Sequence, residues 1–331
     1  MAKFFSAPRK LGVTGPEVFP MALGCMGMSG MYGPADEAES IATIHAALDA
    51  GVQVIDTGDF YGMGHNEMLI GRALEGKRNQ VLLSVKFGAQ RGPDGNWLGY
   101  DARPAAVKTA LAYSLQRLKT DHIDIYRPAR LDPNVPIEET IGAIAEMVQA
   151  GYVRHIGLSE VGPETIQRAA KAHPIVDLQI EYSLITRGAE AKIFPTLDKL
   201  GLATTAYGLL SRGLLSGSKP AGKGDFRAWL PRFTGDNHAQ NEKLIAELAR
   251  MAAAKGVTQT QLAIAWALAK RGSLIPVVGA RTRKQLAESL GALEVSLTAG
   301  ELAALEAAVP AEAIAGTRYG ADQMRSLDSE K

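Results

Sequence analysis

The chain has 331 residues, of which 46% are hydrophobic and 21% are charged, so it can bury a full globular core. Its 36 Lys and Arg residues nearly balance its 35 Asp and Glu residues, which argues against non-specific binding to nucleic acid. The single cysteine, Cys25, excludes an intrachain disulfide. One Cys and six His, without a CxxC or HExxH motif, argue against a metal site.

The beginning of the chain, MAKFFSAPRKLG, lacks the apolar core and the cleavage site of a signal peptide. No run approaches the roughly 18 apolar residues that a membrane-spanning helix needs. We therefore expect a cytoplasmic protein without membrane or nucleic-acid partners. Monomer and homo-oligomer are equally compatible with the sequence.

Short runs rich in β-branched residues recur along the chain and predict buried strands. Eight such runs are found, at residues 52–57, 81–86, 123–127, 155–159, 176–181, 203–207, 274–278 and 293–297. Between them, apolar residues recur at helical spacing. This spacing predicts helices over residues 37–50, 104–118, 137–150, 163–172, 240–255 and 258–270.

Eight strands that alternate with helices favour a (β/α)8 TIM barrel, formed by residues 1–331 as one domain. The rival fold, a doubly wound sheet, usually has GxGxxG after its first strand, whereas here DTGDFYGMG follows. The segment LGVTGPEVFPMALG predicts an N-terminal β-hairpin. Residues 216–238, rich in Gly, Pro and charge, predict a lid loop after strand six that covers substrate or cofactor.

Titratable residues at the carboxyl ends of barrel strands are candidates for catalysis. Asp56 ends the first predicted strand, Tyr61 follows in the next loop, and Lys86 ends the second. An ammonium group near a phenol lowers the pKa of the phenol, which helps it to donate a proton to a carbonyl. The alternative is a salt bridge at the barrel mouth beside a surface tyrosine.

Several motifs resemble the aldo-keto reductase superfamily, in order, from about residue 11 to 305. They are VIDTGDFYG at 54–62, Lys86 after LLSV, GYVRHIGLSE at 151–160, AYGLLSRGLLSG at 206–217 and IPVVGARTRKQLAES at 275–289. The resemblance implies a (β/α)8 barrel, NADPH as cofactor, and hydride transfer to an aldehyde or ketone without metal. It assigns Asp56, Tyr61 and Lys86 as catalytic residues.

The chain departs from that family at its fourth catalytic residue, a His after the third predicted strand. Ala129 stands at that position, within YRPARLD. Tyr61 then works without the imidazole, or Arg127, Arg130 or a water molecule supplies a donor, or the barrel has lost activity. We assign Met28, Trp97, Arg127, Ala129 and Arg130 to the substrate pocket.

The family resemblance also implies the cofactor-binding residues. Those expected around the nicotinamide are Ser159, Glu160, Gln179 and Tyr207, and those expected in the loop over the pyrophosphate are Leu210, Arg212, Gly213, Leu215 and Gly217. Those expected around the adenosine phosphate are Gly279, Arg281, Thr282, Gln285, Glu288 and Ser289. Arg281 suits bidentate contact with a 2′-phosphate, which favours NADPH over NADH. A solvated first helical turn is the alternative for Arg281.

The sequence PARLDPNVPIEET and Glu160 also resemble the yeast-type pyridoxal reductases. A small-molecule carbonyl is therefore the expected substrate, with reduction of pyridoxal to pyridoxine as the preferred reaction. Alternatives are a xenobiotic or sugar-derived ketone, with reaction in either direction. Two further alternatives are a nucleotide-sensing subunit that resembles the potassium-channel β subunits, and a lyase that uses Lys86 as a Schiff base.

Overall fold

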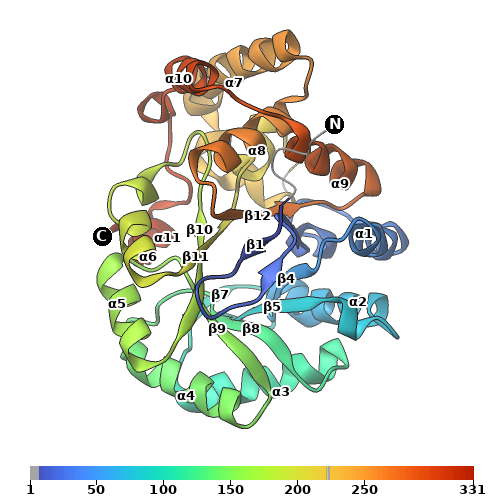
Figure 1. Cartoon of the computed structure of the whole chain (residues 1–331), viewed down its shortest axis with the longest axis vertical. Helices are drawn as coiled ribbons and strands as arrows, with labels where there is room; N and C mark the ends of the chain where they lie inside the picture. Colours follow the sequence, from blue (N-terminus) through green and yellow to red (C-terminus); the bar gives the residue numbers. More distant parts are fainter. Residues whose placement is uncertain (1–6, 221, 223) are drawn as a thin grey trace.

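Eight short parallel strands close into a barrel at the centre of the structure (Figure 1). A computed structural model describes residues 7–220, 222 and 224–331. In chain order the barrel strands are β3 (Ala22–Gly24), β4 (Val54–Gly58), β5 (Leu82–Phe87), β8 (Ile123–Pro128), β9 (Val153–Ser159), β10 (Ile175–Glu181), β11 (Ala203–Tyr207) and β12 (Leu274–Gly279). Pairing of β12 with β3 closes the ring. The predicted (β/α)8 barrel is therefore confirmed.

Helices surround the barrel because their apolar faces bury the outer faces of the strands. The ring consists of α1 (Glu37–Asp49), α2 (His65–Ala73), α3 (Pro104–Leu118), α4 (Ile137–Gln149), α5 (Pro163–Ala172), α6 (Ile193–Leu200), α8 (Gln259–Lys270) and α9 (Arg283–Leu290) (Figure 1). Further helices are α7 (Gly235–Lys255), α10 (Ala299–Ala308) and α11 (Ala321–Arg325). The six helices predicted from periodicity are all present.

Two strand predictions need correction. Residues 293–297 form no strand: the 3-10 helix Gly291–Glu294 leads into an irregular segment. The first barrel strand is instead β3, which lies within the segment LGVTGPEVFPMALG that predicts the hairpin. Asp56 and Lys86 therefore lie on the second and third barrel strands, and the proposed lid segment 216–238 follows the seventh strand, not the sixth. A strand of three residues is too short to show a period, so only its pairing identifies it.

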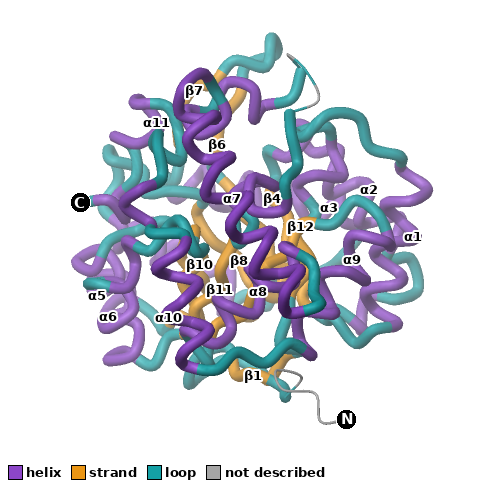
Figure 2. The backbone as a smooth tube through the Cα atoms, turned by 90° about the horizontal axis from the view of Figure 1, so that it is seen from above, coloured by secondary structure: helices purple, strands orange, loops and turns teal. Residues whose placement is uncertain are grey.

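The N-terminal hairpin pairs β1 (Arg9–Lys10) with β2 (Glu17–Val18), as predicted. Leu11 and Val18 are buried against residues of the barrel strands, among them Ile125 and Val176. Figure 2 shows β1 at one end of the barrel and the hairpin of β6 (Ala89–Arg91) and β7 (Trp97–Tyr100) at the other. The first hairpin thus closes the end opposite to the carboxyl ends of the strands.

The proposed lid segment connects the end of β11 with the region of β3, which lies two strands further along the barrel ring. It contains the 3-10 helices Phe226–Trp229 and Pro231–Phe233 and the start of α7, while residues 221 and 223 lie outside the described residues. The Phe226 amide donates to the carbonyl of Met31, and the Arg227 guanidinium lies 5.4 Å from the centre of the Tyr32 ring. The segment therefore reaches the loop that follows β3.

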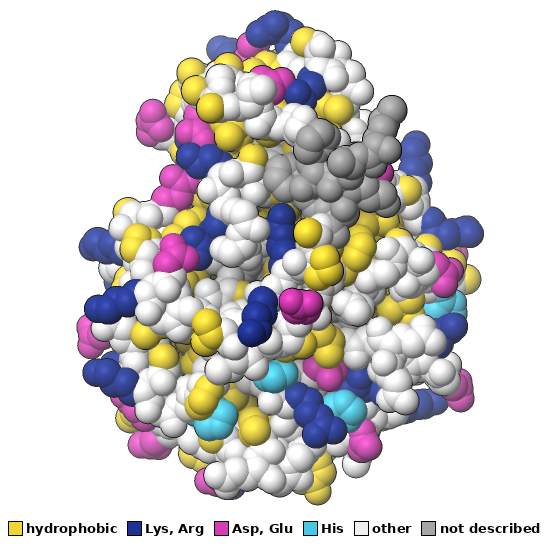
Figure 3. Space-filling model, in the orientation of Figure 1, with side chains coloured by type: hydrophobic (Ala, Val, Ile, Leu, Met, Phe, Trp, Pro, Cys, Tyr) yellow, Lys and Arg dark blue, Asp and Glu magenta, His cyan; other side chains and the backbone are white. Residues whose placement is uncertain are grey.

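Within the described ranges, no helix combines the length and the apolar character needed to cross a bilayer. On the face that Figure 3 presents, basic and acidic side chains are interspersed.

Candidate active site

Asp56 and Lys86 form an ion pair at the carboxyl ends of two neighbouring strands. Strands β4 and β5 pair Asp56 with Ser84 and Gly58 with Lys86, so both side chains emerge at the same end of the barrel. The Lys86 Nζ atom lies 2.5 Å from Asp56 Oδ1. Asp56 Oδ2 accepts hydrogen bonds from Ser84 Oγ and Gln179 Nε2, each at 2.8 Å. Burial lowers the pKa of Lys86, and the carboxylate of Asp56 acts in the opposite direction.

Tyr61 lies directly above this pair. It begins the 3-10 helix Tyr61–Gly64, and the Lys86 Nζ atom is 5.2 Å from the centre of its ring. Burial and the charge of Asp56 raise the pKa of Tyr61, and the charge of Arg130 acts against them. This corrects our expectation of a lowered phenol pKa, because burial and the charge of Asp56 outweigh the effect of Arg130. Tyr61 is therefore protonated at neutral pH and holds a proton that it can donate.

Ala129 occupies the point where the family histidine is expected. Its amide donates to the carbonyl of Phe87 at 2.8 Å, which ties the end of β8 to the end of β5. The side chain is 2% exposed, so this buried position holds a methyl group where an imidazole is expected.

The two arginines near Ala129 have different surroundings. Arg127 is buried inside the barrel, where Nη1 lies 3.0 Å from Asp177 Oδ2 and Nη2 donates to Ser84 Oγ at 3.2 Å. Arg130 instead extends over the mouth, and its Nη2 atom lies 3.2 Å from the Tyr319 hydroxyl and 3.5 Å from that of Tyr207. Of the two, only Arg130 is placed at the entrance to the barrel.

The remaining residues assigned to the substrate pocket are separated in the structure. Met28 is buried in the main core cluster, in the 3-10 helix Met26–Ser29 after β3. Trp97 lies on β7, is 43% exposed, and packs edge-on against Tyr100. It is therefore not part of the buried group around Tyr61.

The residues expected around the nicotinamide gather at the ends of β9, β10 and β11. The Ser159 hydroxyl is buried and has no hydrogen-bond partner among the described residues. Gln179 donates to Asp56, which connects this group to the Asp56–Lys86 pair. The Tyr207 hydroxyl donates to Glu160 at 2.8 Å. An unpartnered hydroxyl beside a buried amide suits the carboxamide of a nicotinamide ring.

Glu160 is held in an unusual backbone conformation, with φ at 54°. Its carboxylate accepts hydrogen bonds from Arg318 at 2.9 and 2.7 Å and from Ser329 at 2.6 Å. Burial alone would raise the pKa of Glu160, but the charge and hydrogen bonds of Arg318 outweigh it and lower the pKa to about 2. Glu160 is therefore ionised at neutral pH.

The carboxyl-terminal segment supplies two residues that the sequence analysis missed. Arg318 is buried at the mouth, and Tyr319 places its hydroxyl 3.1 Å from that of Tyr207. They follow the last ring helix by nearly thirty residues, and no local spacing marks them. The signal available was a pair of large polar side chains in the tail sequence GTRYG.

The loop after β11 contains the residues expected at the pyrophosphate. The 3-10 helix Ser211–Ser216 places Arg212 3.1 Å from Glu181 Oε2 and 4.3 Å from the centre of the Tyr319 ring. Gly213 and Gly217 have φ values of 95° and 71°, which favour glycine. Leu210 is half-buried and Leu215 is fully buried. The two leucines therefore anchor the loop, and Arg212 faces the mouth.

The residues expected at the adenosine phosphate surround the start of α9. Gly279 ends β12, and Thr282 caps the helix by accepting from the Gln285 amide at 3.3 Å. The Arg281 guanidinium donates to the carbonyls of Tyr32 and Pro34 and is in no ion pair within the described part of the chain. Glu288 is half-buried and Ser289 is buried. A cation without an acidic partner at a helix N-terminus suits a phosphate group.

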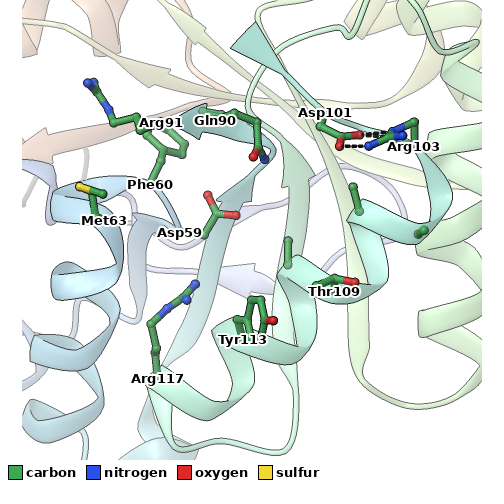
Figure 4. A pocket seen from close by; sticks show the side chains of 14 residues that line it. Asp59, Phe60, Met63, Gln90, Arg91, Asp101, Arg103, Thr109, Tyr113 and Arg117 are labelled. Carbon is green, nitrogen blue, oxygen red and sulfur yellow. Dashed lines mark hydrogen bonds and ion pairs between the residues drawn. The ribbon is translucent and has the colours of Figure 1, made fainter. Parts of the chain in front are cut away.

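A separate cavity of about 500 Å³ lies outside the mouth, between α3 and the β6–β7 hairpin (Figure 4). Asp59 points into it, with Arg91, Arg103 and Arg117 around its rim. Burial raises the pKa of Asp59 to about 7, helped by the charge of Glu67. Asp56, Lys86 and Tyr61 do not line this cavity, so it is distinct from the site described above.

A closed parallel barrel with titratable side chains gathered at the carboxyl ends of its strands is the arrangement of a barrel enzyme. A family model described as "Aldo/keto reductase family" matches residues 20–310. A "Probable aldo-keto reductase 1" from Glycine max is 38% identical over 319 residues, which cover 94% of this chain and 91% of the relative. The chain belongs to the aldo/keto reductase family, whose members are NADP-dependent oxidoreductases that act on carbonyl groups.

Solved structures show the same architecture. A glycerol dehydrogenase from Gluconobacter oxydans is 29% identical with a TM-score of 0.82, over 93% of this chain and 95% of that one. An aldo/keto reductase from Klebsiella pneumoniae, described in complex with NADP and acetate, is 26% identical with a TM-score of 0.73. The match covers 91% of this chain and 95% of that one.

Proposed function

We propose that this chain is an NADPH-dependent carbonyl reductase in which Tyr61 donates the proton, Lys86 and Asp56 support it, and pyridoxal is the preferred substrate. The observation that carries the reductase activity is the buried Asp56–Lys86 pair beneath the Tyr61 ring. The family membership makes NADPH the cofactor, and the NADP complex of the Klebsiella pneumoniae neighbour supports this assignment.

The chain provides groups that fit this cofactor at two ends of the site. The unpartnered Ser159 hydroxyl and the amide of Gln179 would hold the nicotinamide carboxamide, and Tyr207 would lie against the ring. Arg281 would pair with the 2′-phosphate at the start of α9. When bound, NADPH supplies the hydride that adds to the carbonyl carbon.

Residues of the chain then supply the proton that the carbonyl oxygen needs. As negative charge develops on the carbonyl oxygen, the Tyr61 hydroxyl donates its proton to that oxygen. The phenolate that remains is unfavourable in a buried site, and the Lys86 ammonium at 5.2 Å from the ring reduces this cost. Asp56 keeps Lys86 charged and oriented through the 2.5 Å contact.

The choice of pyridoxal depends on the resemblance at Ala129 and on the space that this residue leaves. A methyl group takes up less volume than an imidazole, and on this difference alone we expect a ring-bearing carbonyl to be accepted, although Ala129 itself is only 2% exposed. The phenolic oxygen of pyridoxal lies beside its aldehyde and can polarise it through an internal hydrogen bond. Both features suit a site without the family histidine.

The test is a panel of carbonyls followed by the loss of NADPH absorbance, with NADH as the control cofactor. It includes pyridoxal, propanal, benzaldehyde, an aryl ketone and a ketose, together with glycerol oxidation by NADP. We expect the highest kcat/KM with pyridoxal. A higher kcat/KM with a xenobiotic or sugar-derived ketone would overturn pyridoxal as the preferred substrate but keep the reductase activity. If no compound is turned over faster than by Tyr61→Phe, both the substrate and the reductase activity are overturned.

A further inference from the structure

The guanidinium of Arg130 lies across the mouth of the barrel. Arg130 follows the end of β8, whereas Tyr207 ends β11, and β9 and β10 separate these two strands in the ring. The Nη2 atom nevertheless lies 3.5 Å from the Tyr207 hydroxyl and 3.2 Å from that of Tyr319. A side chain that joins distant strands of a closed ring must pass over the opening that substrates enter.

Arg130 differs from the other cations of the mouth in its partners. Lys86 pairs with Asp56, Arg212 pairs with Glu181, and Arg318 pairs with Glu160. Throughout the described ranges, Arg130 has no carboxylate within ion-pair distance. Its neighbours are two phenols and the backbone carbonyl of Ala129, which Nη1 contacts at 2.6 Å.

Part of the Arg130 guanidinium also lacks a hydrogen-bond partner. Its Nε atom is buried, and no acceptor among the described residues reaches it. Burial lowers the pKa of Arg130, but the neighbouring Tyr207, Tyr319 and Glu160 outweigh it and raise the pKa, so the group stays charged. Both oxygens of Glu160 are already bonded to Arg318. Arg130 is half-buried, and a partly desolvated charge without a carboxylate is unfavourable, so an anion from outside the chain would stabilise it.

The position of Arg130 connects this charge to the reacting group. It directly follows Ala129, and its charge lowers the pKa of Tyr61 against the larger effect of burial. A guanidinium offers a planar set of donors that matches a carboxylate or a phenolate better than a neutral group. A substrate whose carbonyl lies at Tyr61 would therefore place a nearby anionic oxygen within the reach of Arg130.

We propose that Arg130 is the specificity-determining residue for an anionic substrate oxygen, so that the enzyme prefers carbonyl compounds that carry a carboxylate or phenolate near the carbonyl. The proposal rests on the carbonyl reductase function proposed above. It assigns a role to the arginine in the segment where the chain departs from its family.

Two aldehydes of the same shape test this preference. 3-Carboxybenzaldehyde carries the anion on the side of the ring nearer to the aldehyde, and 3-carbamoylbenzaldehyde is its neutral counterpart. We expect kcat/KM to favour the carboxylate by about tenfold or more in the parent enzyme, as a charge-assisted pair allows. Arg130→Gln should bring the ratio close to one, mainly through KM, and Arg130→Lys should restore part of it.

Arg103→Gln is the matched control, because it removes the same charge from an arginine that is paired with Asp101 outside the mouth. In Arg103→Gln, the ratio of kcat/KM for the two aldehydes should equal that of the parent enzyme. Equal ratios in the parent and in Arg130→Gln would overturn the proposal, as would an equal drop in both glutamine variants. Melting curves verify that each variant is folded.

Binding of benzoate and benzamide to the enzyme with NADP, measured by calorimetry, gives a readout that needs no turnover. We expect the affinity for benzoate to fall about tenfold or more in Arg130→Gln, while that for benzamide is unchanged. Arg130-dependent benzoate binding in a protein that reduces no aldehyde would keep this inference and overturn the proposed function. If both aldehydes are reduced and neither rate depends on Arg130, the proposed function is kept and this inference is overturned.

Discussion

The Nζ atom of Lys86 lies 2.5 Å from Oδ1 of Asp56, with both side chains about 5% exposed. Removing one partner of a buried ion pair leaves an uncompensated charge, which usually costs about 3–5 kcal/mol. Lys86→Met should therefore lower the free energy of unfolding by this order and abolish most turnover. Adding Asp56→Asn to Lys86→Met should recover stability but no activity. Urea unfolding of the single and double variants measures both changes, and a double variant no more stable than Lys86→Met would contradict the pairing.

Tyr61→Phe should remove most carbonyl reduction while NADPH still binds. The substitution deletes the proton donor and keeps the ring that packs against Phe60. General acid catalysis contributes roughly 10²–10⁴-fold, so kcat should fall by that factor. Stopped-flow turnover and NADPH fluorescence titration separate the two effects. The control is Tyr113→Phe on the exposed face of α3, and a Tyr61→Phe enzyme within about tenfold of this control would rule out the assignment.

Arg281→Ala should raise the KM for NADPH by about 10–150-fold and leave that for NADH nearly unchanged. The reason is that the proposed partner of the guanidinium, the 2′-phosphate, is absent from NADH. Arg283→Ala is the matched control, since Arg283 lies in the same turn and is already paired with Glu39 at 2.8 Å. Steady-state kinetics with both cofactors tests this, and equal losses with NADPH and NADH would remove the 2′-phosphate role.

Ala129→His should lower kcat/KM for a bulky carbonyl relative to a small aldehyde. The added imidazole would occupy buried volume that a ring-bearing substrate needs. Pyridoxal and propanal, compared in the parent and in the variant, measure the change in preference. If Ala129→His accelerates the reduction of both substrates equally, the parent enzyme lacks only a hydrogen-bond donor at this position. The argument that Ala129 provides space for a bulky substrate would then be wrong.

Glu160 should make stability depend on pH in the acidic range. Its pKa is lowered to about 2 in the folded state, against a value of 4.5 for a free carboxyl. A lowered pKa means that the stabilisation is complete above about pH 4.5, declines as the pH falls, and is lost below about pH 2. Unfolding free energies between pH 2 and 5 should fall more steeply in the parent than in Glu160→Gln. If the unfolding free energies of the parent and of Glu160→Gln change with pH in the same way, Arg318 does not stabilise the ionised form of Glu160.

Local patterns in the sequence were enough to predict six of the helices and most barrel strands, because periodicity of apolar residues depends only on near neighbours. Helix Pro104–Leu118, for example, begins and ends where its proline and its apolar spacing predicted. The helices α2, α6, α9, α10 and α11 were not predicted. The segment 293–297 shows the limit of this reasoning. Its alternation resembles a strand, but the barrel ring is completed by Ala22–Gly24. Strand pairing is a long-range contact that no local window contains.

The sequence by itself determined the family, the barrel and the three residues Asp56, Tyr61 and Lys86, since these lie in short motifs beside predicted strands. Only the tertiary structure decided where the side chains of the two arginines around Ala129 lie and what they contact. Arg127 is satisfied inside the barrel by Asp177, whereas Arg130 crosses the mouth. It also brought Arg318 against Glu160, 158 residues earlier in the chain. Buried charges must find partners wherever the fold places them, and that requirement leaves no periodic trace in the sequence.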